Sequence, residues 1–356
     1  MLSKPGTSTF TDIMEQPQAW RHVLEVLNGQ RGELEAWLRG EKFGQIVLVG
    51  CGSAWHAALS AARVFHSLGL NAVALPASEV LYASRPPYDI RIKTLLIGLS
   101  RSGETSETIW AMEKLKGLDA RLKTLTLTCR EANEMGPLGD VALVFPGVHE
   151  EGVIATRSHT SMLLALEVLA SWLTGNEALF AELSALPDAF DLKKYQNEVQ
   201  KAVALKPQHI TFLGNGPFFG LAAANALLVR EMANQSSDYM PLLEFRHGSH
   251  SSVLPHTLIV GYVSDTLRKA EEDMIREIAV MRGPRMIICG EADNKTKMGT
   301  EFVFELGTAR SEAARLCLSI PIGQLFGFYL GIKNGVNPDR PKHVQPVVKL
   351  KDRIGA

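Results

Sequence analysis

A short segment rich in hydroxyl side chains has the composition of a phosphate site. Residues 100–105 have the sequence Ser-Arg-Ser-Gly-Glu-Thr, between an apolar run and a segment typical of a helix. Hydroxyls and the free N–H groups of a helix N-terminus bind phosphate, and a glycine lets backbone N–H groups turn inward. A simple helix cap needs one hydroxyl, whereas five lie between residues 100 and 108. We therefore expect a phosphate site whose ligands include Ser100, Arg101, Ser102 and Thr105.

An earlier glycine turn, residues 50–53 with the sequence Gly-Cys-Gly-Ser, also follows an apolar run. Ligands of open parallel sheets bind beyond the carboxyl ends of the strands, so this turn is expected beside the same crevice. It lacks a third glycine at the dinucleotide spacing, and the chain has no Walker sequence. The phosphate is therefore expected to belong to a metabolite rather than to a nucleotide.

A second polar cluster has side chains suited to proton transfer. Glu231 lies in the Ala- and Leu-rich stretch 221–232, where apolar neighbours would favour its neutral form and make it a general base. A solvated surface glutamate is the alternative. His247 could transfer protons near neutral pH or be a hydrogen-bonded core histidine. Glu244, His247 and His250 have a spacing that invites a metal ion, but no fourth ligand is near, so no metal is expected.

An internal repeat indicates how these residues are positioned. Residues 46–52 and 210–216 each combine an apolar run with a Gly-X-Gly turn before an Ala-rich stretch, and residues 94–98 match 257–261 at nearly the same offset. An apolar run, a tight turn and a helix form a βα unit of a parallel sheet that is covered on both faces. The sequence therefore predicts an α/β fold with two tandem doubly wound, flavodoxin-like domains.

The domain boundaries follow from this pattern. We expect a helical leader over 1–34, a first domain over 35–180, a second over 195–335 and an extended tail over 336–356. The apolar stretches 161–173 and 318–332 are too short to span a bilayer and are predicted to be buried helices. Further strands are expected at 72–75, 125–128, 142–145, 285–289 and 301–306.

Composition and charge exclude several classes of function. The 356 residues carry a formal net charge of -1, so neither nucleic acid nor an anionic membrane is an expected partner. The four cysteines form no CxxC pair, and the N-terminal residues contain no export signal, which favours reduced thiols and a cytoplasmic protein. No cofactor is expected.

Taken together and in order along the chain, the motifs resemble the tandem sugar isomerase (SIS) family. This family includes the isomerase half of glucosamine-6-phosphate synthase, stand-alone amino-sugar-phosphate deaminases and fructosamine-phosphate deglycases. The similarity extends over nearly the whole chain. It is carried by residues 50–53, 100–105, 152–157 (Gly-Val-Ile-Ala-Thr-Arg), the helix of Glu231, 244–248 (Glu-Phe-Arg-His-Gly) and 337–341 (Asn-Pro-Asp-Arg-Pro).

The resemblance implies a sugar 6-phosphate as substrate and a role for each motif. Glu231 would carry a proton between C1 and C2 through an enediol or enolamine, and His247 would open the sugar ring from the partner subunit, which implies a homodimer. The tail would lie over the active site. The 100–105 segment would bind the 6-phosphate with help from Gly52 and Ser53, and further pocket residues would be Cys51, Thr156, Arg157 and Glu244.

Departures from the family pattern leave alternatives open. Two lysines of the synthase are replaced by Pro346 and Leu228, so the synthase reaction is not expected, although Lys342, Lys349 or Lys351 could replace the tail amine. The chain also shows no N-terminal cysteine nucleophile of an amidotransferase, so glutamine is not expected as its nitrogen source.

Three functions therefore remain. The first is an isomerase of a hexose or amino-sugar 6-phosphate, with or without amine release. The second is a deglycase of a 6-phospho-fructosamine, in which Arg101 or Arg157 would face an amino-acid carboxylate. The third is a regulatory module that binds a phosphosugar without turning it over.

Overall fold

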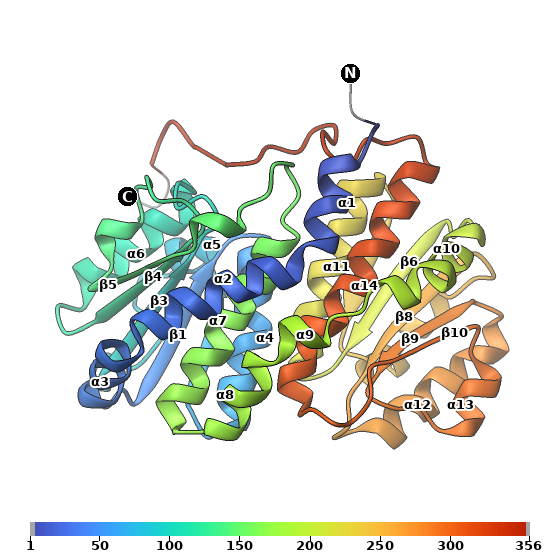
Figure 1. Ribbon diagram of the computed structural model, residues 1–356, viewed down its shortest axis with the longest axis horizontal. Coiled ribbons are helices and arrows are strands. Elements are labelled where there is room, and N and C mark those ends of the chain that lie inside the picture. The colour runs from blue at the N-terminus through green and yellow to red at the C-terminus, as the bar shows by residue number, and fades with distance from the viewer. Residues whose placement is uncertain (1–3, 354–356) are drawn as a thin grey trace. The chain divides into compact units, whose positions relative to one another are not determined.

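The computed structural model describes residues 4–353 and contains two parallel five-stranded sheets flanked by helices (Figure 1). The first sheet has the strand order β2-β1-β3-β4-β5 and the second has β7-β6-β8-β9-β10. If the strands of each sheet are numbered 1 to 5 along the chain, both sheets have the order 2-1-3-4-5, which is that of doubly wound flavodoxin-like sheets. The predicted fold class is confirmed.

The first sheet organises one compact unit, whose described residues are 15–150, 157–187 and 345–353. We call it the first-sheet unit. Its strands are β1 (Gln45–Gly50), β2 (Ala72–Pro76), β3 (Thr94–Leu99), β4 (Lys123–Thr128) and β5 (Val141–Val144). Its helices are α2 (Gln16–Gly29), α3 (Arg31–Glu41), α4 (Ser53–Ser67), α5 (Ala77–Tyr82), α6 (Ser106–Leu118), α7 (Arg157–Thr174) and α8 (Glu177–Ser184).

The second-sheet unit comprises the described residues 4–14, 151–156 and 188–344. Its strands are β6 (His209–Gly214), β7 (Ser237–Met240), β8 (Thr257–Val263), β9 (Arg285–Cys289) and β10 (Phe302–Glu305). Its helices are α1 (Thr7–Met14), α10 (Gln196–Ala204), α11 (Phe218–Ala233), α12 (Arg268–Glu277), α13 (Asn294–Gly299) and α14 (Glu312–Lys333), while the short α9 (Leu186–Ala189) contains the sequence boundary between the units. The domain ranges expected from the sequence stay a prediction.

The burial and the positions of the central strands agree with their apolar sequences. Every residue of β1, β3 and β8 is buried, as expected for strands that are covered on both faces. The strands predicted near 72, 125, 142, 285 and 301 correspond to β2, β4, β5, β9 and β10. The sequence analysis missed the edge strand β7, because its Ser-Asp-Tyr-Met sequence is half polar and only its pairing with β6 defines it.

The apolar stretch 318–332 belongs to a longer helix, α14, which, contrary to the expectation from the sequence, is long and apolar enough to span a membrane by length and composition. However, 83% of its apolar window is buried within the structure. It packs closely on α11 because three glycines face that helix. A Cβ atom on Gly331 would lie 2.3 Å from the carbonyl oxygen of Met232, and one on Gly323 would lie 2.4 Å from Nδ2 of Asn225. Gly327 lies between them, against Met232 and Val229. This close packing fixes the backbone of α11 beside Glu231.

Candidate functional site

The two glycine-containing turns predicted to bind phosphate leave the same edge of the first sheet. Strand β1 pairs with β3 in parallel, with Val49 opposite Gly98, so the turns that follow both strands are neighbours. The strand order reverses between these two strands, and ligands of open α/β sheets bind at such a switch point. The fold therefore places residues 51–53 and 100–105 beside each other at one edge of the sheet.

Hydrogen bonds among its own hydroxyls preform the 100–105 loop. Ser100 Oγ lies 3.1 Å from Thr105 Oγ1 and accepts the Gly103 N–H at 3.1 Å, while Ser102 Oγ accepts the Glu104 N–H at 3.1 Å. Helix α6 begins directly after the loop, at Ser106. The loop thus holds neutral donors at a helix N-terminus, where a dianion can replace these internal partners at little cost in rearrangement.

Gly103 gives the loop a shape that other residues resist. Its φ is +66°, in the left-handed region that side chains disfavour, and a Cβ atom there would lie 2.5 Å from Cβ of Asn133. The Met135 N–H also donates to the Gly103 carbonyl oxygen at 2.9 Å. The segment after β4 therefore supports the loop from behind.

Arg101 has a partner that the sequence did not reveal. Its Nη1 donates to Oε2 of Glu150 at 3.2 Å, and its Nη2 donates to the carbonyl oxygen of Pro346 at 2.9 Å. The Glu150 side chain is fully buried, and its Oε1 accepts the Ser158 N–H at the start of α7 at 2.8 Å. Much of the positive charge of Arg101 is therefore balanced within the protein.

The first glycine turn, residues 50–53, has fewer hydroxyl donors than the 100–105 loop. Gly52 has a φ of +51° and is exposed, and Ser53 opens α4. Cys51 lies 3.4 Å from Oγ1 of Thr108, and burial raises the pKa of its thiol. A thiol with a raised pKa is a poor nucleophile at neutral pH, so Cys51 is suited to contribute bulk and a weak hydrogen-bond donor rather than to attack a substrate.

Beneath this turn lies a buried histidine, His159. One ring nitrogen, Nδ1, lies 3.0 Å from the carbonyl oxygen of Ser53, while Nε2 is buried without a hydrogen-bond partner in the described part of the chain. Burial lowers the pKa of His159 to about 4, because the charged ring would lose its hydration. The histidine is therefore neutral at physiological pH and supports the Ser53 turn as a hydrogen-bond donor.

His159 makes folding stability depend on pH. The unfolded chain binds a proton at this residue below about pH 6.5, whereas the folded protein does not until about pH 4. The free energy of unfolding should thus fall by about 3 kcal/mol as the pH drops between these values. The free energy of unfolding, measured with urea at each pH from 7 to 4, should fall less steeply with pH for His159→Leu than for wild type. The control is His149→Leu, at an exposed histidine. If the free energy of unfolding changed equally with pH in wild type and in His159→Leu, His159 would not be the source of the pH dependence.

The corresponding switch point of the second sheet is already occupied by carboxylates of the chain. Buried Glu271 accepts hydrogen bonds from Nδ2 of Asn215 at 2.7 Å and from the Ser264 N–H at 2.6 Å. Oε2 of Glu312 accepts the Asp265 N–H at 2.6 Å. These donors correspond in position to the candidate phosphate donors of the first sheet, and a bound anion there would face negative charge. The matching segment of the second half, residues 263–267 (Val-Ser-Asp-Thr-Leu), also lacks the glycine and the arginine of residues 100–105.

Glu231 lies in the last turn of α11 and is half-buried. The helix ends at Asn234, which has a left-handed conformation with a φ of +49°. Because Met232 is held against α14, the backbone that carries Glu231 has little freedom. Leu228, at the position of a family lysine, is buried in the core of the unit.

His247 and Glu244 lie on an exposed turn of the same unit. Glu244 opens a short 3₁₀ turn (Glu244–Arg246), and its carbonyl oxygen accepts the His247 N–H at 2.9 Å. Phe245 is buried and anchors the turn, and Arg246 pairs with Glu277 at 2.9 Å. Both side chains are exposed on this turn, so His247 is not the hydrogen-bonded core histidine of the alternative.

Thr156 and Arg157 belong to different units, although they are adjacent in sequence. The carbonyl oxygen of Thr156 accepts Nε2 of Gln324 at 3.1 Å in the second-sheet unit. Arg157 pairs with Glu15 at 3.2 Å and donates to the carbonyl oxygen of His149 at 2.9 Å in the first-sheet unit. Each residue is thus fixed within its own unit.

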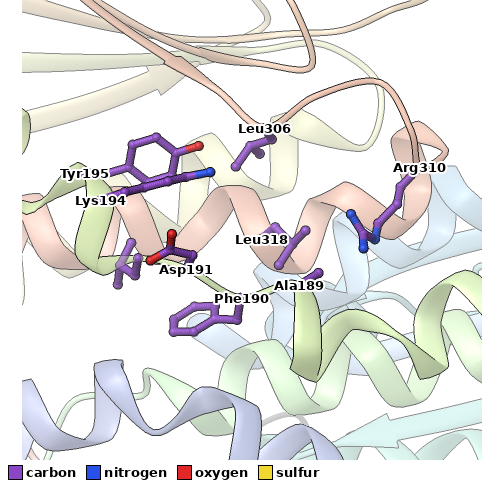
Figure 2. Close-up of a pocket in the computed structure, with 9 residues that line it drawn as sticks. Ala189, Phe190, Asp191, Lys194, Tyr195, Leu306, Arg310 and Leu318 are labelled. Carbon is purple, nitrogen blue, oxygen red and sulfur yellow. The ribbon is translucent and has the colours of Figure 1, made fainter.

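A separate pocket in the second-sheet unit contains none of the predicted site residues. Figure 2 shows its lining side chains, which include Asp191, Lys194, Tyr195 and Arg310. Its volume is only about 30 Å³, enough for one water molecule. This pocket is too small for a sugar phosphate.

One family model matches the part of the chain that contains the first sheet. Residues 38–172 match the model of the SIS domain. The match contains all five strands of the first sheet and the 100–105 loop, which we call the phosphate loop after its predicted ligand.

Related proteins are named for reactions of sugar 6-phosphates. The chain is 26% identical to the glutamine–fructose-6-phosphate aminotransferase (isomerizing) of Pyrococcus horikoshii, over 99% of this chain but 59% of that protein. The chain thus spans about three-fifths of the length of that relative. A crystal structure of glucosamine-6-phosphate deaminase from Thermotoga maritima is 27% identical with a TM-score of 0.73 and covers 92% of this chain and 100% of its own.

The fold itself is shared more widely. The crystal structure of tagatose-6-phosphate ketose/aldose isomerase from Escherichia coli has a TM-score of 0.80 at 21% identity, covering 98% of this chain and 99% of its own. At this identity the likeness concerns the fold alone.

Proposed function

We propose that this protein isomerises a hexose or amino-sugar 6-phosphate by transferring a proton between C1 and C2, with or without release of the amine. The observation that carries the proposal is the preformed, hydroxyl-rich loop at the β1/β3 switch point of an SIS domain. We further propose that the second sheet forms a second SIS domain and that the protein acts in the cytoplasm without a metal or cofactor.

In this mechanism the 6-phosphate binds to Ser100, Ser102 and Thr105, with the glycine turn closing the other side. His247 moves the proton that opens the sugar ring. The carboxylate of Glu231 then removes a proton from one of C1 and C2 and returns it to the other, which converts aldose and ketose through an enediol. For an amino sugar, the corresponding enolamine tautomerises to an imine, whose hydrolysis would release ammonia. One base can serve both carbons because they are adjacent.

The deglycase alternative has less support from the site. It needs an arginine to face the carboxylate of an amino acid, yet Arg101 is held by Glu150 and Pro346, and Arg157 by Glu15. An assay panel separates the functions. Interconversion of fructose and glucose 6-phosphates indicates an isomerase, ammonia release from glucosamine 6-phosphate a deaminase, and amine release from 6-phospho-fructosamines a deglycase. Saturable binding without any turnover would contradict the enzymatic proposal.

We also propose a homodimer in which His247 completes the partner's site, as its exposure on a fixed turn allows. Mixed dimers test this arrangement. Glu231→Gln and His247→Asn chains are each expected to be inactive, but a refolded 1:1 mixture should recover about a quarter of wild-type activity, since half of the dimers gain one intact site. Recovery requires that Glu231 and His247 of one site come from different chains. No recovery from a mixture shown by mass spectrometry to contain mixed dimers would contradict the shared site.

A further inference from the structure

The C-terminal residues 346–350, which we call the tail strap, lie along the phosphate loop within the first-sheet unit. The Ser106 N–H donates to the Val348 carbonyl oxygen at 3.2 Å, and the Leu350 N–H donates to Ser106 Oγ at 3.0 Å. Ser106 is the first residue of α6, so its N–H would otherwise lack an intrahelical partner. The strap is therefore docked on the helix N-terminus that follows the phosphate loop.

Lys349 adds an electrostatic contact to this docking. Its ammonium lies 3.1 Å from Glu134 and 3.3 Å from Glu104, which is itself part of the loop. The ammonium is half-exposed, so these pairs alone hold the strap weakly. A stronger anchor is needed to keep an exposed chain segment in one place.

Arg101 is placed to be that anchor. It bonds both the strap, through the Pro346 carbonyl oxygen, and a fully buried carboxylate, that of Glu150. The Arg101 side chain is 17% exposed, so its pair with Glu150 is partly shielded from water and from salt. Glu150 is in turn fixed by the Ser158 N–H at the start of α7, where the helix dipole favours an acidic group.

We propose that Glu150 is a positioning residue, which orients Arg101 so that Arg101 docks the tail strap on the phosphate loop. This inference deepens the proposed function, because the docked strap would complete the wall around the bound phosphate. Losing Glu150 frees the guanidinium, releases Pro346 and loosens the loop at Ser106. The expected kinetic effect is a KM for the sugar phosphate raised about tenfold with kcat changed by less than about threefold.

Hydrogen exchange of the full chain without substrate tests the docking separately from any activity. In Glu150→Gln the amide of Leu350 should exchange at least about tenfold faster than in wild type, since its hydrogen bond opens with the strap. Glu15→Gln is the matched control: this carboxylate also pairs with an arginine at 3.2 Å, but its side chain is 47% exposed and does not contact the strap. Wild-type exchange in Glu150→Gln would overturn the proposal.

A second variant separates positioning from a merely structural role and remains usable if Glu150→Gln does not fold. Arg101→Lys keeps a positive charge beside Glu150 but cannot hold Glu150 and Pro346 together with one compact ammonium. We expect a melting temperature close to that of wild type, fast exchange at Leu350 and a raised KM. A strap that stays protected in Arg101→Lys would overturn the proposal. Fast exchange together with unchanged KM would contradict the link to substrate binding while leaving the proposed function intact.

Discussion

Replacing Glu231 by glutamine is expected to lower kcat by about a thousandfold, since a positioned general base contributes between a hundredfold and ten-thousandfold. Glutamine has the shape of glutamate, and α11 is held firmly against α14, so the helix should keep its position. The phosphate donors belong to the other unit and are unchanged. Affinity for the sugar phosphate, measured by calorimetry, should therefore stay within about threefold of wild type.

Glu198→Gln is the control for this prediction. Glu198 is an exposed glutamate of the same unit that pairs with Lys201 on its own helix, and its loss should leave kcat unchanged. A Glu231→Gln enzyme with wild-type turnover would show that another residue is the base. A Glu231→Gln protein that no longer binds the sugar phosphate would instead assign Glu231 to binding.

Replacing Gly103 by alanine is expected to lower kcat/KM by about a hundredfold, because misplacing a binding group by an ångström can have an effect of that size. A methyl group at Gly103 would lie 2.5 Å from Cβ of Asn133, in a backbone conformation that alanine disfavours. The loop must then shift, and the hydroxyls of Ser100 and Ser102 shift with it. The loss should appear mainly in KM.

Gly117→Ala provides the matched comparison on the helix that follows the loop. A Cβ atom there meets nothing within 4 Å, and alanine is about 1 kcal/mol better than glycine inside a helix. This variant should be slightly more stable than wild type, with unchanged kinetics. Equal kcat/KM values for Gly103→Ala and wild type would contradict the assignment of the phosphate site to this loop.

The position of the phosphate loop could be predicted because its signal is local. A glycine and several hydroxyls directly after an apolar run predict a strand, a turn and the start of a helix. The strand and turn recur in the second half of the sequence, and the two sheets have the same strand order. The sequence of residues 263–267 also shows that the second half lacks the glycine and the arginine. It could not show that Glu271 takes the place of the anion, because that contact depends on how α12 packs against β8.

The contact of Glu150 with Arg101 could not be predicted from the sequence for the same reason. It lies 49 residues from Arg101 in sequence, in a loop without regular structure, and only folding brings the two side chains within 3.2 Å. Similarly, the sequence does not reveal that Lys349, one of the three lysines that could replace the tail amine, pairs with Glu104 and Glu134. Side-chain partners that are distant in sequence are fixed by tertiary packing rather than by local pattern.

The central claim is enol-type proton transfer by Glu231 on a sugar 6-phosphate. The most direct measurement is proton NMR of fructose, glucose and glucosamine 6-phosphates incubated with the protein in deuterated water. We predict that deuterium from the solvent enters at C1 or C2 of at least one of these sugars, and that this exchange disappears in Glu231→Gln but persists in Glu198→Gln. Saturable binding of the sugars with no deuterium at either carbon would contradict the account and favour a phosphosugar-binding regulatory role.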